Sequence, residues 1–364
     1  MESKMKIFLI SNMYPSSKDS LFGVFVRNFR LQLEKMGVVF SAVSVIKGKR
    51  SNTIGKAISY FGYYCSICYN FIFKSYDLIY VHFMSHNAPA LAFLFFLFKK
   101  RKPLVINVHG DDVTHSKGRK IDILNKYVLK KVDLVVTPSD YFKDMMLHNY
   151  PFLANEQIFT SPSGGVDAKR FYPMAKTIHE IPILGMVSRI DEGKGWDDFL
   201  TALKTLKEKN IPFKAIIAGQ GLQETEMKTM MHDFGIKENV EFLGLVKQEQ
   251  LVHLYNKMDV MVFPTKREAE SLGLVGLEAM SCKTPVIGGD IAGLKTYIKD
   301  TKNGMLFQPG NVSELTSCIE KYLNFSQEER EKMGNAAFKT AEQYESGYVS
   351  KKLLEQLKKV CIRN

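Results

Sequence analysis

Two glutamates near the start of an expected helix could bind the hydroxyl groups of a ligand. The apolar pattern predicts a strand that ends at Phe263, then a loop and a helix from about Gly273. Glu270 precedes this helix and Glu278 lies about two turns inside it, so a rotation of about 100° per residue would leave the two acids about 80° apart. Amides at a helix start favour an anion, whereas carboxylates accept hydrogen bonds from hydroxyls. The stretch therefore predicts a site for an anionic ligand that also carries hydroxyl groups.

Two basic residues upstream could stabilise a diphosphate. An expected strand over residues 183–188 is followed by a loop that contains Arg189 and Lys194. Fixed cations at the end of a strand can stabilise a diphosphate leaving group without a metal ion. No Asp-x-Asp follows a strand where it could hold magnesium, and Cys65 and Cys68 lack the neighbouring ligands of a zinc site. We therefore expect no metal site and no cofactor.

Short apolar strands alternate with helical stretches in both halves of the chain. In the first half the strands are expected over 6–11, 38–46, 77–82, 103–109 and 132–137. In the second half they are expected over 183–188, 215–218, 240–243, 259–263 and 285–288. This alternation is typical of parallel βαβ units, which bind ligands at the carboxyl edge of the sheet. The turn Gly219-x-Gly221 lies at that edge and is either a close approach to a phosphate or only a tight turn.

The same alternation predicts an α/β protein with two Rossmann-like, doubly wound parallel-sheet domains. An N-terminal domain is expected over 1–172 and a C-terminal domain over 181–344. The aperiodic stretch 171–182, which holds two prolines, is the expected linker. A helix over about 345–364 is expected to pack back on the N-terminal domain. The length of 364 residues and the 45% hydrophobic content suit two domains, each with its own core.

The positive charge is confined to the first half. Residues 1–173 hold 24 Lys and Arg against 12 Asp and Glu, whereas residues 174–364 hold 26 of each. The net charge of +12 therefore predicts an anionic partner for the N-terminal half, such as an anionic lipid or a phosphorylated substrate. Nucleic acid is not expected, because no recognition motif accompanies the charge. Five cysteines favour a reducing compartment, and the four apolar residues 7–10 are too few for an export signal.

Two uncharged apolar segments lie in the same half. Residues 57–73 are flanked by Lys56 and Lys74, and residues 88–98 are followed by a basic run over 99–102. Both are shorter than the roughly 20 residues that a spanning helix needs. A buried crossover helix is expected for each. For the first segment, its tyrosines and flanking lysines leave a membrane interface open as the alternative.

Together these motifs resemble the retaining glycosyltransferases of family 4, which have the GT-B fold of two facing Rossmann-like domains. The resemblance rests on Glu270-x7-Glu278, Arg189-x4-Lys194, Gly219-x-Gly221 and Phe242-Leu-Gly-Leu-Val246. In the first half it extends to Phe22-Gly23-Val, to Asp77-Leu-Ile-Tyr-Val-His82, to His109-Gly-Asp-Asp112 and to the stretch Ser161–Pro173. It thus covers nearly the whole chain.

The resemblance implies a role for each matching residue. Arg189, Lys194, Glu270 and His109 would be catalytic: the two cations would bind the donor diphosphate, and the other two would contact the transferred sugar. Donor binding would fall to Gly23, Gly219, Gly221, Leu245, Val246, Leu272, Gly273, Leu274 and Glu278, with Glu278 on the ribose and Leu245 and Val246 beside the base. Leu272 stands where the family usually has Phe, and Leu294-Lys295-Thr296 where it has Pro-Glu, which indicates a donor pocket that differs there.

The implied activity is metal-independent, retaining transfer of a hexose from a nucleotide sugar, with UDP favoured as the carrier and GDP second. The acceptor would be a glycan or a polyprenyl-diphosphate-linked glycan in bacterial capsule, O-antigen or exopolysaccharide synthesis. The location would be cytoplasmic, peripheral on the anionic inner face of the plasma membrane. A nucleotide-sugar 2-epimerase of similar fold and a non-catalytic membrane-associated protein remain alternatives. A dinucleotide dehydrogenase is disfavoured, because no Gly-x-Gly-x-x-Gly follows the first strand.

Overall fold

The chain divides into two compact units. The computed structural model describes residues 4–19, 22–49, 52–99, 101–114, 120–175 and 178–363. The first unit comprises Met1–Gly164 and Ser346–Asn364, and the second comprises Gly165–Glu345. The stretch 171–182, expected as the linker, falls within the second unit, where the Met174 amide donates to Asn256 Oδ1 at 2.7 Å. Lys100 of the basic run 99–102 lies outside the described residues, as do Lys117 and Arg119.

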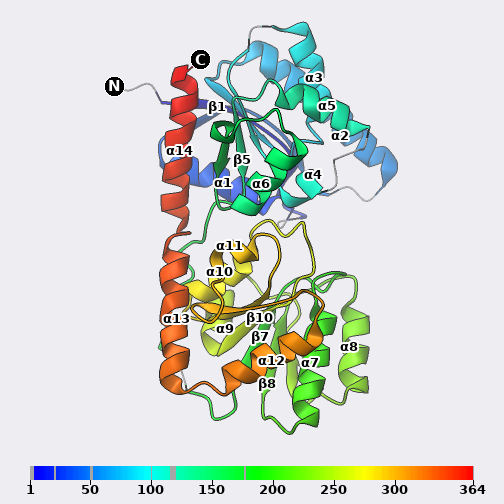
Figure 1. Cartoon of the computed structure of the whole chain (residues 1–364). Helices are drawn as coiled ribbons and strands as arrows, with labels where there is room; N and C mark the ends of the chain where they lie inside the picture. The colour runs from blue at the N-terminus through cyan, green and yellow to red at the C-terminus, as the bar shows by residue number, and fades with distance from the viewer. Residues whose placement is uncertain are drawn as a thin grey trace. The chain divides into compact units, whose positions relative to one another are not determined.

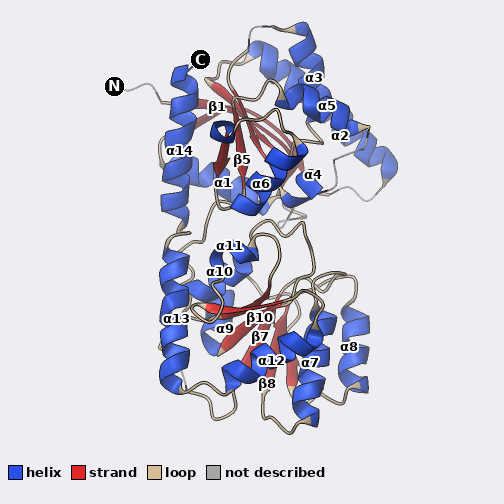
Figure 2. Ribbon diagram, in the orientation of Figure 1, coloured by secondary structure: helices blue, strands red, loops and turns tan. Residues whose placement is uncertain are grey.

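The first unit is built on a parallel sheet flanked by helices (Figure 2). This sheet has six strands in the order β2-β1-β3-β4-β5-β6. Its strands are β1 (Lys6–Tyr14), β2 (Val39–Lys47), β3 (Leu78–His82), β4 (Leu104–Asn107), β5 (Leu134–Thr137) and β6 (Ile158–Thr160). Five of them were expected from the apolar pattern. Edge strand β6 was not expected.

Alternate residues of each strand supply two hydrophobic cores, one on each face of this sheet. On one face Ile7 and Leu9 of β1 pack with helices α1 (Val24–Lys35) and α14 (Ser346–Arg363). On the other face Phe8 and Ile10 pack in a larger core. That core is covered by α2 (Thr53–Phe73), α3 (Ala88–Leu97), α4 (Gly110–Thr114), α5 (Ile121–Leu129) and α6 (Asp140–Asn149).

The second unit has its own parallel sheet, in the order β12-β11-β10-β7-β8-β9. Its strands are β7 (Ile183–Val187), β8 (Lys214–Ala218), β9 (Val240–Phe242), β10 (Val260–Phe263), β11 (Val286–Gly289) and β12 (Gly304–Phe307). Its helices are α7 (Trp196–Glu208), α8 (Glu224–Asp233), α9 (Leu251–Lys257), α10 (Leu274–Ser281), α11 (Leu294–Tyr297), α12 (Val312–Leu323) and α13 (Gln327–Glu342) (Figure 1). Two doubly wound parallel sheets with flanking helices are the GT-B architecture that the sequence predicts.

The strand order of the second unit reverses between β7 and β10. These two strands pair with each other although two strands and three helices separate them along the chain, and Val260 lies opposite Leu184. Such a reversal is where open α/β sheets bind ligands, because the loops after the two strands diverge and leave a crevice. The loops after β7 and β10 hold Arg189, Lys194 and Glu270. The topology therefore gathers the predicted donor residues at one point of the sheet edge.

The two uncharged segments of the first unit both lie in crossover helices. Residues 57–73 fall in α2, which joins β2 to β3, and residues 88–98 cover α3, which joins β3 to β4. Each helix is buried on the side that packs on the unit and exposed on the other. The expectation of a buried crossover helix is therefore confirmed for one side of each helix and wrong for the other. Within the described ranges, no helix combines the length and apolar character needed to cross a membrane.

Candidate active site

Lys194 and Glu270 form an ion pair at the switch point of the second sheet. Lys194 Nζ lies 2.6 Å from Glu270 Oε2, and the two side chains are only 11% and 15% exposed. Thr265 Oγ1 donates to the same oxygen at 3.3 Å. Within the part of the chain that the structure describes, no hydrogen bond is made to Glu270 Oε1. The pair thus offers a fixed cation and a carboxylate oxygen that can accept a further hydroxyl.

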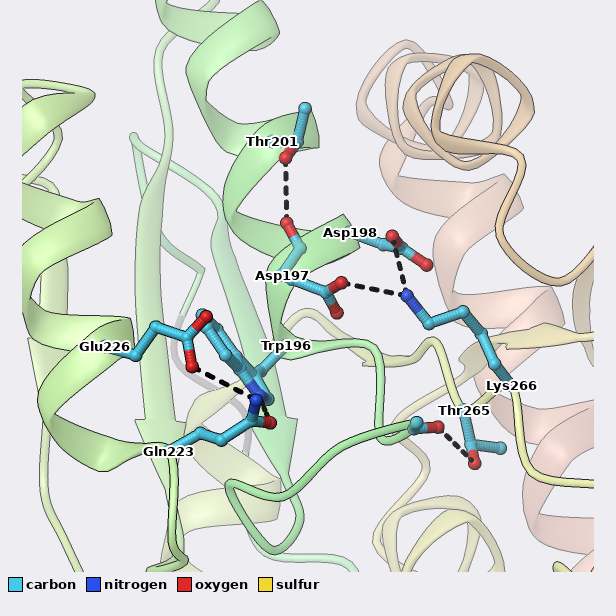
Figure 3. A network of polar contacts seen from close by, with 9 residues as sticks. Trp196, Asp197, Asp198, Thr201, Gln223, Glu226, Thr265 and Lys266 are labelled. Atoms are coloured by element: carbon cyan, nitrogen blue, oxygen red, sulfur yellow. Dashed lines mark hydrogen bonds and ion pairs between the residues drawn. The ribbon is translucent and has the colours of Figure 1, made fainter.

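A network of polar contacts holds the loop that carries Lys194 (Figure 3). Lys266, three residues beyond β10, reaches the first turn of α7, where Nζ lies 2.9 Å from Asp197 and 3.1 Å from Asp198. The Lys266 amide also donates to the Gly193 carbonyl at 2.8 Å. Burial raises the pKa of Asp198, and the Lys266 ammonium opposes that rise. Lys266 therefore ties the β10–α10 loop to the end of the β7–α7 loop and to the start of α7.

We expect Lys266→Met to lower stability by about 1–3 kcal/mol, because Asp198 is largely buried and would lose a charged hydrogen-bond partner. The transfer activity that the resemblance implies should fall less than on loss of Lys194 itself, since the hydrogen bond from the amide of residue 266 to the Gly193 carbonyl remains. Urea unfolding and kcat measure the two effects. Lys266→Arg should restore both. The matched control is Lys228→Met, whose partner Glu224 lies one turn away on exposed α8, and it should cost about 0.3–0.5 kcal/mol. Equal losses in the two methionine variants would contradict the positioning role of Lys266.

Arg189 follows β7 directly and extends toward solvent. Its side chain is 62% exposed, and Nη1 lies 2.8 Å from Asp191 Oδ2. The turn Gly219-x-Gly221 packs under this loop: a Cβ on Gly219 would lie 1.7 Å from the Ser188 carbonyl oxygen, and one on Gly221 would lie 2.1 Å from that of Ile190. Both glycines are thus required by the packing of one loop on another, which favours the tight-turn interpretation left open by the sequence.

Glu278 is buried on α10 and has a different partner from Glu270. It accepts a hydrogen bond from the Tyr255 hydroxyl at 2.9 Å. Burial raises the pKa of Glu278 to about 7, although the Tyr255 bond and the charge of Arg170 act in the opposite direction. Because α10 begins at Leu274, Glu270 lies in the preceding loop, and the expected separation of about 80° along one helix is wrong.

The remaining donor candidates of the second unit surround these loops. Leu272 is 2% exposed, Gly273 caps α10 in the left-handed conformation with φ 71°, and Leu274 packs on the core as the first helical residue. Leu245 is 57% exposed and Val246 is packed against the same core. Only Leu245 among these five presents a large apolar surface to solvent.

In the first unit, His109 lies in an aromatic cluster at the carboxyl edge of the sheet. Its ring stacks on Phe83 with centroids 4.3 Å apart, and Nε2 lies 3.3 Å from Nδ1 of His82, the last residue of β3. Burial lowers the pKa of His109 to about 3, so the imidazole is neutral at physiological pH. Gly23 caps α1, and a Cβ there would lie 2.6 Å from the backbone of Met13.

Several positioning residues were missed from the sequence. In the second unit these are Thr265, Lys266, Asp197, Asp198 and Tyr255. In the first unit Asp112 accepts backbone bonds from Met84 at 2.9 Å and Ser85 at 3.2 Å, tying the loop after β4 to the loop after β3. Two signals in the sequence could have identified three of these residues. Lys266 lies just beyond a strand, and Asp197 and Asp198 lie in the first turn of a helix, where acidic residues are favoured.

Among the described residues, no group of three or more His, Cys, Asp and Glu side chains is arranged to hold a metal ion. The described cations of the two donor loops are Arg189, Lys194, Lys266 and Arg267. Lys194 is paired with Glu270, and Lys266 is paired with the two acids in the first turn of α7. The arrangement can bind an anion through Arg189 and Lys194 and hydroxyl groups through Glu270 and Glu278.

The fold and these loops define a GT-B protein, and comparison with known proteins gives the family. Residues 173–340 match the model described as glycosyl transferases group 1, and residues 27–170 match that of glycosyltransferase family 4. Together with the two doubly wound sheets, these matches place the chain among the GT-B glycosyltransferases of the family 4 and group 1 type.

Three known proteins illustrate the similarity. The chain is 27% identical over 143 residues to a 2-deoxystreptamine glucosyltransferase of Streptomyces kanamyceticus. The aligned residues cover 36% of that protein and 39% of this chain. Its fold is similar to that of sucrose-phosphate synthase from Thermosynechococcus elongatus, with a TM-score of 0.79, 17% identity and coverage of 99% and 100% of the two chains. Anabaena HepE in complex with UDP matches with a TM-score of 0.74, 18% identity and coverage of 98% and 100%. The chain thus spans about a third of the length of the curated relative.

Proposed function

We propose that the protein transfers a sugar from a nucleotide-sugar donor to a glycan or lipid-linked acceptor, with retention of the anomeric configuration. The observation that carries this proposal is the Lys194–Glu270 pair at the switch point of the second sheet, with Arg189 on the same loop as Lys194. A cation paired with a carboxylate suits a ligand that has a diphosphate beside a ring of hydroxyls. The similarity to a glucosyltransferase and to a UDP complex supports the same reaction and favours UDP over GDP.

In this mechanism Arg189 and Lys194 stabilise the negative charge that develops on the diphosphate as the bond from the sugar carbon to the leaving oxygen breaks. Glu270 Oε1 accepts a sugar hydroxyl and Glu278 accepts the ribose hydroxyls. The acceptor oxygen forms its new bond on the face from which the diphosphate departs, and its proton passes to a phosphate oxygen. The neutral imidazole of His109 can donate or accept one hydrogen bond at the sugar. Neither a metal ion nor an enzyme nucleophile is required.

Nucleotide binding alone tests the choice of donor. A ligand that binds only the folded state at 100 times its Kd stabilises a protein by about 2.7 kcal/mol. We expect UDP to raise the Tm more than GDP does. If neither nucleotide at millimolar concentration moves the Tm, the second unit does not bind a nucleotide and the proposal fails.

The affinity for the donor should depend on pH through Glu278. Because burial holds the pKa of Glu278 near 7, the carboxyl is mostly protonated at pH 6 and then accepts ribose hydroxyls poorly. At one pH unit below the pKa, about a tenth of the protein has an ionised Glu278 and can bind the ribose in this way. The apparent Kd for the nucleotide should therefore rise about tenfold between pH 8 and pH 6. Glu278→Gln should bind more weakly and show a flat profile. Calorimetric titration at both pH values measures this, and an equal pH dependence in the variant would assign the titration to another group.

The site of action that we propose is an anionic membrane surface, at the cytoplasmic face of the cell. All of the net charge of +12 lies in the first half of the chain. A polyprenyl-diphosphate-linked acceptor would be presented at such a surface, and each exposed Lys or Arg close to it contributes about 1 kcal/mol of binding. This part of the proposal predicts binding that weakens with salt.

A further inference from the structure

The exposed side of α2 is apolar from residue 57 to the end of the helix at Phe73. Its other side packs on the sheet through buried residues that include Tyr63 and Ile67. The solvent-facing side carries no charged residue from 57 to 73. Its large exposed members are Ile54, Ile58, Phe61, Tyr69, Ile72 and Phe73, and with exposed Cys65 they recur at helical spacing. A surface helix normally has polar residues on this side, and a helix that is apolar all round is covered by something.

Helix α3 continues this apolar surface. The rings of Phe71 and Phe98 have centroids 5.6 Å apart, and at the other end the Tyr60 hydroxyl lies 3.1 Å from Nδ1 of His86. The two helices therefore run side by side in the same direction (Figure 1). On α3 the solvent-facing residues are again large and apolar: Phe93, Phe96 and Leu97, of which Phe96 is 78% exposed. Neighbouring exposed apolar residues of this number mark an interaction surface.

Basic residues gather where both helices end. Lys74 follows α2 and Lys99 follows α3, and both are exposed. Beside them a cavity of about 740 Å³ is lined by Lys74, Arg101 and Lys102, with Asp77 as the one acidic residue of the lining. Asp77 already accepts a hydrogen bond from the Lys6 amide. Arg101 is paired with Asp133 at 2.7 Å, so the positive charge at this end comes from Lys74, Lys99 and Lys102, which suits an anionic group.

We propose that this α2–α3 face docks on an anionic lipid bilayer, with its exposed phenylalanines and isoleucines at the acyl boundary and its lysines at the headgroups. An apolar helix face flanked by cations is the pattern of an interfacial helix. The positive edge favours anionic headgroups over a second copy of the chain, because the segments 57–73 and 88–98 carry no acidic residue that could pair with these cations. The inference rests on the proposed function and assigns its membrane contact to one surface. Burial of apolar side chains, and not charge alone, holds this surface on the bilayer.

Vesicle co-sedimentation tests the proposal with the full chain. The vesicles are phosphatidylcholine alone, or phosphatidylcholine with about a third phosphatidylglycerol, at low and high salt. We expect the wild-type protein to prefer the anionic vesicles and to keep part of its binding at high salt. The double variant Phe61→Ser/Phe96→Ser should lower the partition coefficient about tenfold or more, since two apolar side chains lose their burial. Lys74→Gln/Lys102→Gln should lower binding to the anionic vesicles only.

The matched control is Leu222→Ser in the second unit, which removes a side chain that is 97% exposed and should leave binding unchanged. The Tm of each variant confirms that the exposed substitutions leave the fold intact. Wild-type partitioning onto neither vesicle, or equal partitioning of the Phe61→Ser/Phe96→Ser variant, overturns the proposal. So does a concentration-dependent dimer that the same variant disperses, since a second copy would then cover the face. Nucleotide binding is measured separately: vesicle binding without it would leave the docking surface standing while the proposed transfer failed.

Discussion

Lys194→Ala is expected to lower kcat by about 10²–10³, which is the usual loss when one preorganised electrostatic stabiliser is removed. The Lys194 ammonium is 11% exposed and is held 2.6 Å from Glu270 on a loop that Lys266 ties to the neighbouring loop. A cation fixed in this way costs little reorganisation when charge develops on the leaving diphosphate. Steady-state nucleotide release at saturating donor measures the effect.

The substitution also leaves Glu270 partly buried without its cation, so stability has to be followed beside activity. The double variant Lys194→Ala/Glu270→Gln removes that unpaired charge and should regain Tm without regaining kcat. Activity that returns with the Tm would mean that Lys194 only supports the fold. A kcat within about threefold of wild type in the single variant would exclude Lys194 from the leaving-group site.

Glu270→Ala and Glu278→Ala are expected to fail in different ways. Glu278 lies buried on α10 with Tyr255 as its partner, so a ribose contact there is made equally in the ground and transition states, and its loss should raise the donor KM. Glu270 shares its carboxylate with Lys194 and would contact the sugar as charge develops, so its loss should mainly lower kcat.

Full initial-rate analysis of both variants separates the two effects. Glu278→Gln and Glu270→Gln keep the volume of each side chain and serve as the conservative controls. Identical changes in KM and kcat for the two alanine variants would contradict the division of roles, and would indicate that the glutamates act as one unit.

The strands with a run of apolar residues could be predicted from the sequence, and the contacts between loops could not. The run 183–188 predicts β7 well, whereas the edge strands β6 and β12 were not expected from the apolar pattern. Lys194 and Glu270 were both candidates, but the bond between them depends on β7 lying beside β10. That pairing follows from the order of strands in the sheet, which no local pattern specifies.

Individual residues show the same limit. Glu278 was expected as a ribose ligand, but burial raises its pKa, and the hydrogen bond that opposes this rise comes from Tyr255 on another helix. The glycines of the turn after β8 have a steric reason inside the protein, namely the carbonyls of Ser188 and Ile190. The apolar runs 57–73 and 88–98 were visible in the sequence, whereas the exposed side of each depends on how the helix packs on its sheet.

The most direct test of the central claim is a donor screen by nucleotide release, with membrane extract as the acceptor and EDTA present throughout. We predict that one sugar nucleotide, with UDP sugars favoured, releases its nucleotide, that the sugar appears attached to the acceptor fraction, and that Lys194→Ala abolishes most of this. Strict dependence on added Mg²⁺ or Mn²⁺ would contradict the role given to Arg189 and Lys194. Recovery of an isomerised sugar nucleotide with no transfer would instead identify a 2-epimerase.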